Sequence, residues 1–176
     1  MSIAALGSVL TVEQRRVAAL CVAGASSAAI ARQLCLSRSG LASRFHTMRK
    51  KLSRPRSSRA VLAHALLTAG EIPPPAVGRP VPHFTGHELA LIQALAEHSF
   101  NADIGEAIGV RADDVRAEID AVVFKATAAD TAHLIGLGHA WGLFGPAPRA
   151  SSRRTPASSA LTLHAPRAPM SSGSST

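Results

Sequence analysis

The sequence is poor in the residues that build large cores. Among 176 residues there is no tyrosine, one tryptophan and five phenylalanines, so the hydrophobic fraction of 47% consists mainly of small and aliphatic side chains. Any core must therefore be small and helical. No uncharged apolar run reaches the ~18 residues of a membrane span, and the apolar part of the N-terminus is too short for a signal peptide. We therefore expect a cytoplasmic protein without a membrane partner.

Cysteine is also scarce, and no pattern of catalytic or metal-binding residues is visible. Cys21 and Cys35 have no CxxC spacing or histidine cluster beside them, and the eight histidines are scattered. Buried, reduced thiols are the expected state, with a disulfide or a metal site as the alternatives. The sequence therefore predicts neither an enzyme nor a cofactor.

Acidic residues are almost missing from the first part of the chain. Residues 1–70 hold eleven Lys/Arg and the single acid Glu13, a net charge of +10. Residues 71–146 hold four Lys/Arg and ten acids, a net charge of −6, and residues 147–176 hold four Arg and no acid. This distribution indicates an anionic partner for the first part and not for the second.

The first 70 residues predict four short helices. Residues placed to cap them are Thr11, Ser26 or Ser27, and Ser37, while Gly24 and Gly70 follow the first and the fourth. The expected ranges are 11–23, about 27–34, 38 to about 52, and 59–69.

The third of these helices is amphipathic and basic. Leu41, Phe45, Met48 and Leu52 recur at helical spacing and should face inward. The residues that must then face outward are Arg38, Ser39, Ala42, Ser43, His46, Arg49 and Lys50. A short helix, a tight turn at residues 35–36 and a basic helix indicate a helix-turn-helix, with a basic solvated helix on an ordinary core as the alternative.

Spaced residues over positions 10–72 match one known family pattern. They are Leu10, Thr11, Val17, Leu20, Gly24, Ile30, Ala31, Leu34, Leu36, Ser37, Leu41, Lys51, Leu52, Ala63, Ala65 and Leu66. By these residues the segment resembles the LuxR/GerE-type DNA-binding domain. The resemblance implies a bacterial, nucleoid-associated transcription regulator whose third helix enters the major groove of double-stranded DNA and whose fourth often forms the dimer contact.

Five positions depart from the pattern of that family. Gln14 replaces the usual Glu, Cys35 the usual turn Gly, Gly40 a usual Thr and Ala42 a usual Lys, while Arg44 stands where His is common. A cysteine at a turn of positive φ carries strain, and Gly40 weakens its helix by about 0.5–1 kcal/mol relative to Ala.

The resemblance also implies which residues would meet DNA. Candidates for base edges are Ser39, Ser43 and His46, with Ala42 close to them. Candidates for phosphate contacts are Arg38, Arg44, Thr47, Lys50, Lys51, Ser26 and Ser27.

A proline-rich linker, residues 73–82, should be extended and semi-rigid, and it separates two similar sequences. A shift of 74 residues places the apolar pattern of residues 11–51 on residues 85–125 without a gap. In this register Glu88 takes the position of Gln14 and Gly109 that of Cys35. We therefore expect an all-α protein with two tandem four-helix helix-turn-helix domains, residues 10–72 and 83–145.

The second copy lacks the basic outer face. Asp113, Glu118 and Asp120 fall where the first copy has Ser39, Arg44 and His46, and carboxylates are repelled by phosphates. Its uses could be dimerisation, an acidic surface for RNA polymerase or another regulator, or stabilisation of the first copy. Apolar residues of the expected helix 131–141 are candidates for a homodimer interface, with a core position as the alternative for the tryptophan. They are Leu134, Ile135, Leu137 and Trp141.

Residues 146–176 are rich in Ser, Pro, Ala and Arg and predict a disordered tail. The function that these patterns favour is a DNA-binding transcription regulator with one reading domain and one contact domain. Two alternatives remain: a protein-binding adaptor or anti-activator without autonomous DNA binding, and an intramolecular pseudo-dimer with both domains on DNA.

Overall fold

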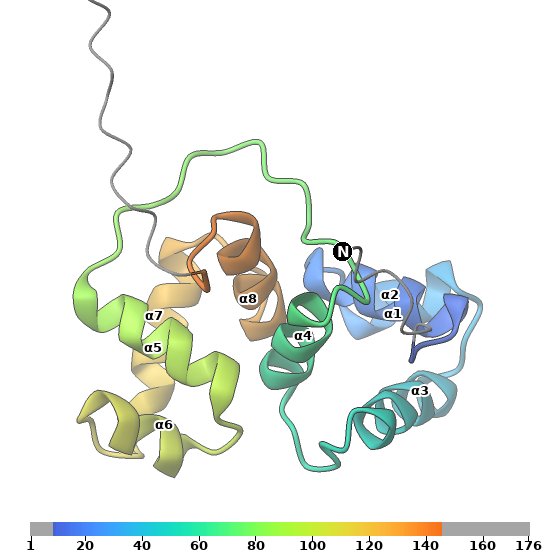
Figure 1. Cartoon of the computed structure of the whole chain (residues 1–176), viewed down its shortest axis with the longest axis horizontal. Coiled ribbons are helices and arrows are strands. Elements are labelled where there is room, and N and C mark those ends of the chain that lie inside the picture. Colours follow the sequence, from blue (N-terminus) through green and yellow to red (C-terminus); the bar gives the residue numbers. More distant parts are fainter. Residues whose placement is uncertain (1–8, 146–176) are drawn as a thin grey trace, which may run out of the picture.

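The computed structural model describes residues 9–145, and in this range it contains helices and no strands (Figure 1). The all-helical fold class is therefore confirmed. The tail predicted to be disordered, residues 146–176, lies outside the described residues. The helices are α1 (Val12–Val22), α2 (Ser27–Gln33), α3 (Arg38–Lys51), α4 (Arg59–Thr68), α5 (Gly86–Glu97), α6 (Asn101–Ile108), α7 (Val115–Lys125) and α8 (Thr131–Ala140).

Side-chain caps fix where most of the helices begin. The hydroxyl of Thr11 accepts a hydrogen bond from the backbone N–H of Gln14, whose side chain accepts one from the N–H of Thr11. Thr85 and Glu88 form the same capping box at α5. Helices α2, α3 and α4 begin with a single side-chain cap each, at Ser26, Ser37 and Ser58. The sequence had indicated the first two. The bounds expected for α1 to α4 are close to those observed.

The two halves of the chain turn at matching positions. Cys35 and Gly109, 74 residues apart, have φ of 52° and 72°, and Ser53 and Thr127 have φ of 56° and 48°. In each half, a lysine near the end of the third helix also donates a hydrogen bond to the side chain at the same position of the first helix. Lys51 donates to Gln14 Oε1 (3.0 Å), and Lys125 donates to Glu88 Oε2 (2.7 Å). The helix order and these turns agree with the repeat seen in the sequence.

Helices α4 and α8 pack against each other in the centre of the molecule, between the α1–α3 group and the α5–α7 group (Figure 1). The buried side chains of both halves belong to one continuous core, which includes Leu66 of α4 and Leu134 of α8. Ile72, just before the linker, is also buried. The linker therefore joins two halves that share a core and does not hold them apart, because the apolar faces of their fourth helices bury each other.

Three of the residues considered for a homodimer interface are buried inside this chain. Leu134 and Ile135 are 0% exposed and Leu137 is 3% exposed, so they offer no surface to a second copy. Trp141 is half-buried, and its ring lies 5.9 Å from that of Phe84, between ring centroids. Gly136 of α8 permits a close approach to α1 of the same chain. A Cβ there would lie 2.6 Å from the carbonyl oxygen of Val22.

The two cysteines differ in their environment. Cys21 is buried in the core, and its loss of solvent, with a smaller effect of Asp130, raises the pKa of its thiol to about 11. Cys35 is exposed, so the expectation of two buried thiols is wrong at this position. The physical reason is that Cys35 occupies the left-handed turn residue before α3, where the side chain leaves the core. Both thiols are free.

Candidate nucleic-acid interface

Helix α3 has one buried face and one exposed face. Leu41, Phe45 and Met48 are 4%, 5% and 0% exposed, and Leu52 is half-buried just after the helix. The expected inner face is therefore confirmed. Exposed residues on the other side are Arg38, Ser39, Ala42, Ser43, His46 and Lys50.

The first turn of α3 is held by hydroxyl groups. Ser37 Oγ accepts a hydrogen bond from the N–H of Gly40 (3.0 Å) and lies 3.0 Å from Ser39 Oγ. A Cβ at Gly40 would lie 3.1 Å from Ser37 Oγ, which is a tight contact, so glycine suits this cap. Ser39 is thus oriented by the cap and remains exposed at the start of the helix.

Several expected DNA-contact residues are unengaged in the structure. The side chains of Arg38, His46 and Lys50 are exposed and form no hydrogen bond or ion pair with other described residues. Ser43 is exposed as well, and its carbonyl oxygen accepts a hydrogen bond from Thr47 Oγ1 (2.9 Å). Positions 38, 46 and 50 therefore present a guanidinium group, an imidazole and an ammonium group directly to solvent.

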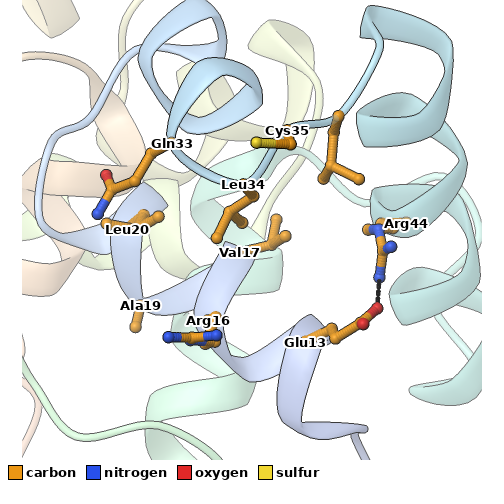
Figure 2. A pocket seen from close by; sticks show the side chains of 10 residues that line it. Glu13, Arg16, Val17, Ala19, Leu20, Gln33, Leu34, Cys35 and Arg44 are labelled. Atoms are coloured by element: carbon orange, nitrogen blue, oxygen red, sulfur yellow. Dashed lines mark hydrogen bonds and ion pairs between the residues drawn. The ribbon is translucent and has the colours of Figure 1, made fainter.

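Arg44 is turned toward α1, where it forms an ion pair with Glu13 (Figure 2). The pair stands beside a surface pocket of about 490 Å³, whose lining includes the apolar side chains of Val17, Leu20 and Leu34. A phosphate contact by Arg44 would have to compete with Glu13, the single acid of the first 70 residues.

Lys51 is also engaged within the chain. Its ammonium group donates to the carbonyl oxygen of Val9 (2.9 Å) and to Gln14 Oε1 (3.0 Å). These bonds connect the end of α3 to the start of α1. The structure thus gives Lys51 a structural contact that the sequence pattern did not indicate.

The two serines at the start of α2 are used locally. Ser26 caps α2 by accepting from the N–H of Ala29 (3.2 Å), and Ser27 Oγ accepts from the Arg59 guanidinium (2.7 Å). Arg59 in turn lies over the Phe45 ring, 5.1 Å from its centroid. Ser27 is half-buried, so of the pair Ser26 is the more accessible.

The segment after α3, residues 53–58, adds exposed cations that were not among the expected DNA-contact residues. Arg54 and Arg56 are exposed in this loop, while Arg49 is fixed to it by donating to the carbonyl oxygen of Ser57 (2.8 Å). The arginines of the SRPRSS sequence were the available signal for a basic loop next to the end of α3.

The corresponding face of α7 has a different chemistry. Arg116 is paired with Asp120 (3.0 Å), and His87 Nε2 lies 3.5 Å from a Glu118 oxygen. Asp113 is exposed, and Phe124, at the position of Lys50, is 86% exposed. Arg116 is thus neutralised by a carboxylate on the same face of α7, whereas Arg38 and Lys50 on α3 have no such partner among the described residues.

Comparisons of the chain with known protein families, curated proteins and solved structures find no match. The resemblance to LuxR/GerE-type domains therefore stays a prediction from the residues. Among residues 9–145, no three His, Cys, Asp or Glu side chains form a group that could hold a metal ion. No helix in this range is long and apolar enough to cross a membrane.

Proposed function

We propose that this protein is a DNA-binding transcription regulator whose helix α3 enters the major groove. The observation that carries the proposal is the division of α3 into a buried apolar face and an exposed face with unpaired Arg38 and Lys50. The turn between α2 and α3 gives the helix-turn-helix arrangement, in which the second helix contacts base edges.

The charge of the surrounding half supports a polyanionic partner. A net charge of +10 in residues 1–70 favours association with phosphates, and exposed Arg54 and Arg56 continue the basic surface beyond α3. Ser39, Ser43 and His46 provide short hydrogen-bonding groups among these cations, and such groups can bind base edges in the major groove.

Salt-dependent binding to random-sequence duplex DNA tests the proposal. Lys50→Gln should weaken binding to all sequences and reduce the slope of log affinity against log salt by roughly one unit, because one phosphate contact is lost. Arg116→Gln, an equally charge-neutralising change on α7, is the matched control and should leave the slope unchanged. Equal effects of the two substitutions, or no binding by the unchanged protein, would contradict the proposal.

The Arg44–Glu13 ion pair gives a second test of the same face. Glu13→Gln removes the competing carboxylate, so the affinity for DNA should rise, whereas Arg44→Ala should lower it. Arg44→Ala without any effect on affinity or salt slope would show that this side chain is outside the interface.

A second candidate function, protein binding by the other half, is favoured by the 86% exposure of Phe124 on an acidic surface. In that case Phe124→Ala would leave DNA affinity unchanged and alter transcription from a promoter that carries a bound sequence. If Phe124→Ala changed neither quantity, this candidate would be excluded.

A further inference from the structure

The contact between α4 and α8 is the most extensive of the described helix pairs. On α4, Leu62 and Leu66 are 2% and 1% exposed, and on α8 both Leu134 and Ile135 are 0% exposed. The apolar residues of both helices are therefore withdrawn from solvent within one chain, as at the centre of a stable interface.

Polar and ring contacts fit the two helices to each other. His64 Nδ1 of α4 lies 3.0 Å from His139 Nε2 of α8, and the ring of Phe144 lies 4.9 Å from the His64 ring, between centroids. On α8, Gly136 also allows a close approach to the backbone of Val22 in α1. Since a Cβ at position 136 would collide with that carbonyl group, α8 is fitted to α1 as well as to α4.

This packing leaves α4 with little surface for another molecule. Its apolar residues Ala60, Val61, Leu62, Ala63, Leu66 and Leu67 are all buried. The exposed large apolar side chains of the described part lie outside α4. They are Val9, Val12, Val81, Leu89, Phe100 and Phe124.

The second half is also poorly suited to read a second groove. Residues 111–114 form a hydrogen-bonded turn before α7, because the N–H groups of Asp114 and Val115 both donate to the carbonyl oxygen of Arg111, but this turn lacks the side-chain cap that Ser37 gives to α3. The N-cap of α7, Asp114, makes no side-chain cap bond. Exposed Asp113 and Asp120 would lie near phosphates and be repelled by them.

We propose that one copy of this chain binds one asymmetric DNA site, with α3 as the single reading helix and α8 in the place of a second subunit against α4. The inference rests on the proposed function and specifies the class of DNA that is bound. A symmetric dimer would place two reading helices on an inverted repeat. Here the internal repeat covers α4, so the recognised sequence has no reason to be palindromic.

Selection of bound duplexes from a random library by the intact protein tests this inference. The random region should span about 30 base pairs, enough for two half-sites one helical turn apart. We expect enrichment of a single non-palindromic element, and sedimentation of the enriched duplex with protein should give one chain per duplex. Ser43→Ala should change the enriched element, whereas Arg116→Ala on α7 should not.

Two results would overturn the inference while leaving the proposed function in place. Enrichment of an inverted repeat with two chains per duplex would show that a dimer surface exists outside α4. Two half-sites bound by one chain would show that α7 reads DNA as well. If the protein neither enriched any sequence nor bound DNA in a salt-dependent manner, both the inference and the proposed function would be wrong.

Discussion

Helices α3 and α7 occupy the same place in the two halves of the chain and differ mainly on their outer surfaces. Their inner positions are matched, with Leu41, Phe45 and Met48 in one and Val115, Ile119 and Val122 in the other, all buried. Their outer positions have lost any likeness, because Lys50 corresponds to Phe124 and Arg44 to Glu118. The buried residues therefore preserve the fold, while the exposed residues can differ and so suit different partners.

The fourth helices extend this comparison from the helix to the molecule. Each buries an apolar face, and the two faces cover each other. The second half therefore helps to bury the core of the first half, although its exposed residues differ from those of the first. Substitutions can test how far the two halves stabilise each other, and the following predictions are arranged by decreasing size of the expected change in stability.

The largest effect should come from a cavity in the shared core. Leu134→Ala removes a side chain that is 0% exposed, and such a change costs about 2–5 kcal/mol of unfolding free energy. Leu89→Ala on α5, where the side chain is 40% exposed, is the matched control and should cost far less. The measurement is equilibrium urea unfolding, followed by circular dichroism and by the fluorescence of Trp141.

The same unfolding experiment tests whether the halves form one unit. Because they share a core, both probes should report one coincident transition for the unchanged protein. Two separated transitions, or a Leu134→Ala variant as stable as Leu89→Ala, would show that the halves are independent.

An intermediate effect is expected at the matched left-handed turns. Cys35→Gly should stabilise the protein and Gly109→Ala should destabilise it, each by about 1 kcal/mol, because φ is 52° and 72° at these positions. Urea midpoints of the two variants measure the change. Gly86→Ala, at the start of α5 where a Cβ would meet no atom within 4 Å, is a glycine control without positive φ. Shifts of the same sign at positions 35 and 109 would contradict the equivalence of the turns.

The smallest effect should be a pH dependence of the α4–α8 contact. Burial lowers the pKa of His64. Burial, together with the charge of His64, lowers the pKa of His139 to about 4. At His64, the negative charge of Glu97 acts to raise the pKa, while the positive charge of Arg54 acts to lower it. As the pH falls, these histidines therefore bind protons in the unfolded chain before they do so in the folded chain. Their contribution to the free energy of unfolding is fully present above the ordinary histidine pKa of 6.5 and is lost as the pH falls toward about 4.

Replacing His139 should reduce that pH dependence. The difference in urea midpoint between pH 7 and pH 5 should shrink in His139→Gln, while the exposed His83→Gln should retain the full difference. His133, whose pKa burial also lowers, contributes to the remaining decrease. An unchanged pH profile in His139→Gln would show that this histidine does not titrate on unfolding.

Much of the fold could be predicted because its local signals agree with each other. The caps at Thr11, Ser26 and Ser37 and the apolar spacing of α3 locate the helices well. The packing of α4 on α8 could not be predicted. An apolar helix face shows that another element covers it, but it does not show which element. Partners such as Glu13 for Arg44 depend on distances across the fold, so sequence spacing alone did not show that Arg44 and Lys51 are already engaged.

We propose that α3 contacts DNA and that α7, in the same position of a similar fold, does not. The most direct test places a photoreactive group on a single cysteine at position 42 or at its equivalent, position 116, both exposed. The experiment uses the whole chain with Cys21→Ser and Cys35→Gly, because the two halves share a core. We expect light-dependent crosslinks to duplex DNA from position 42 only, and high salt should suppress them. Equal crosslinking from position 116, or none from position 42, would contradict it.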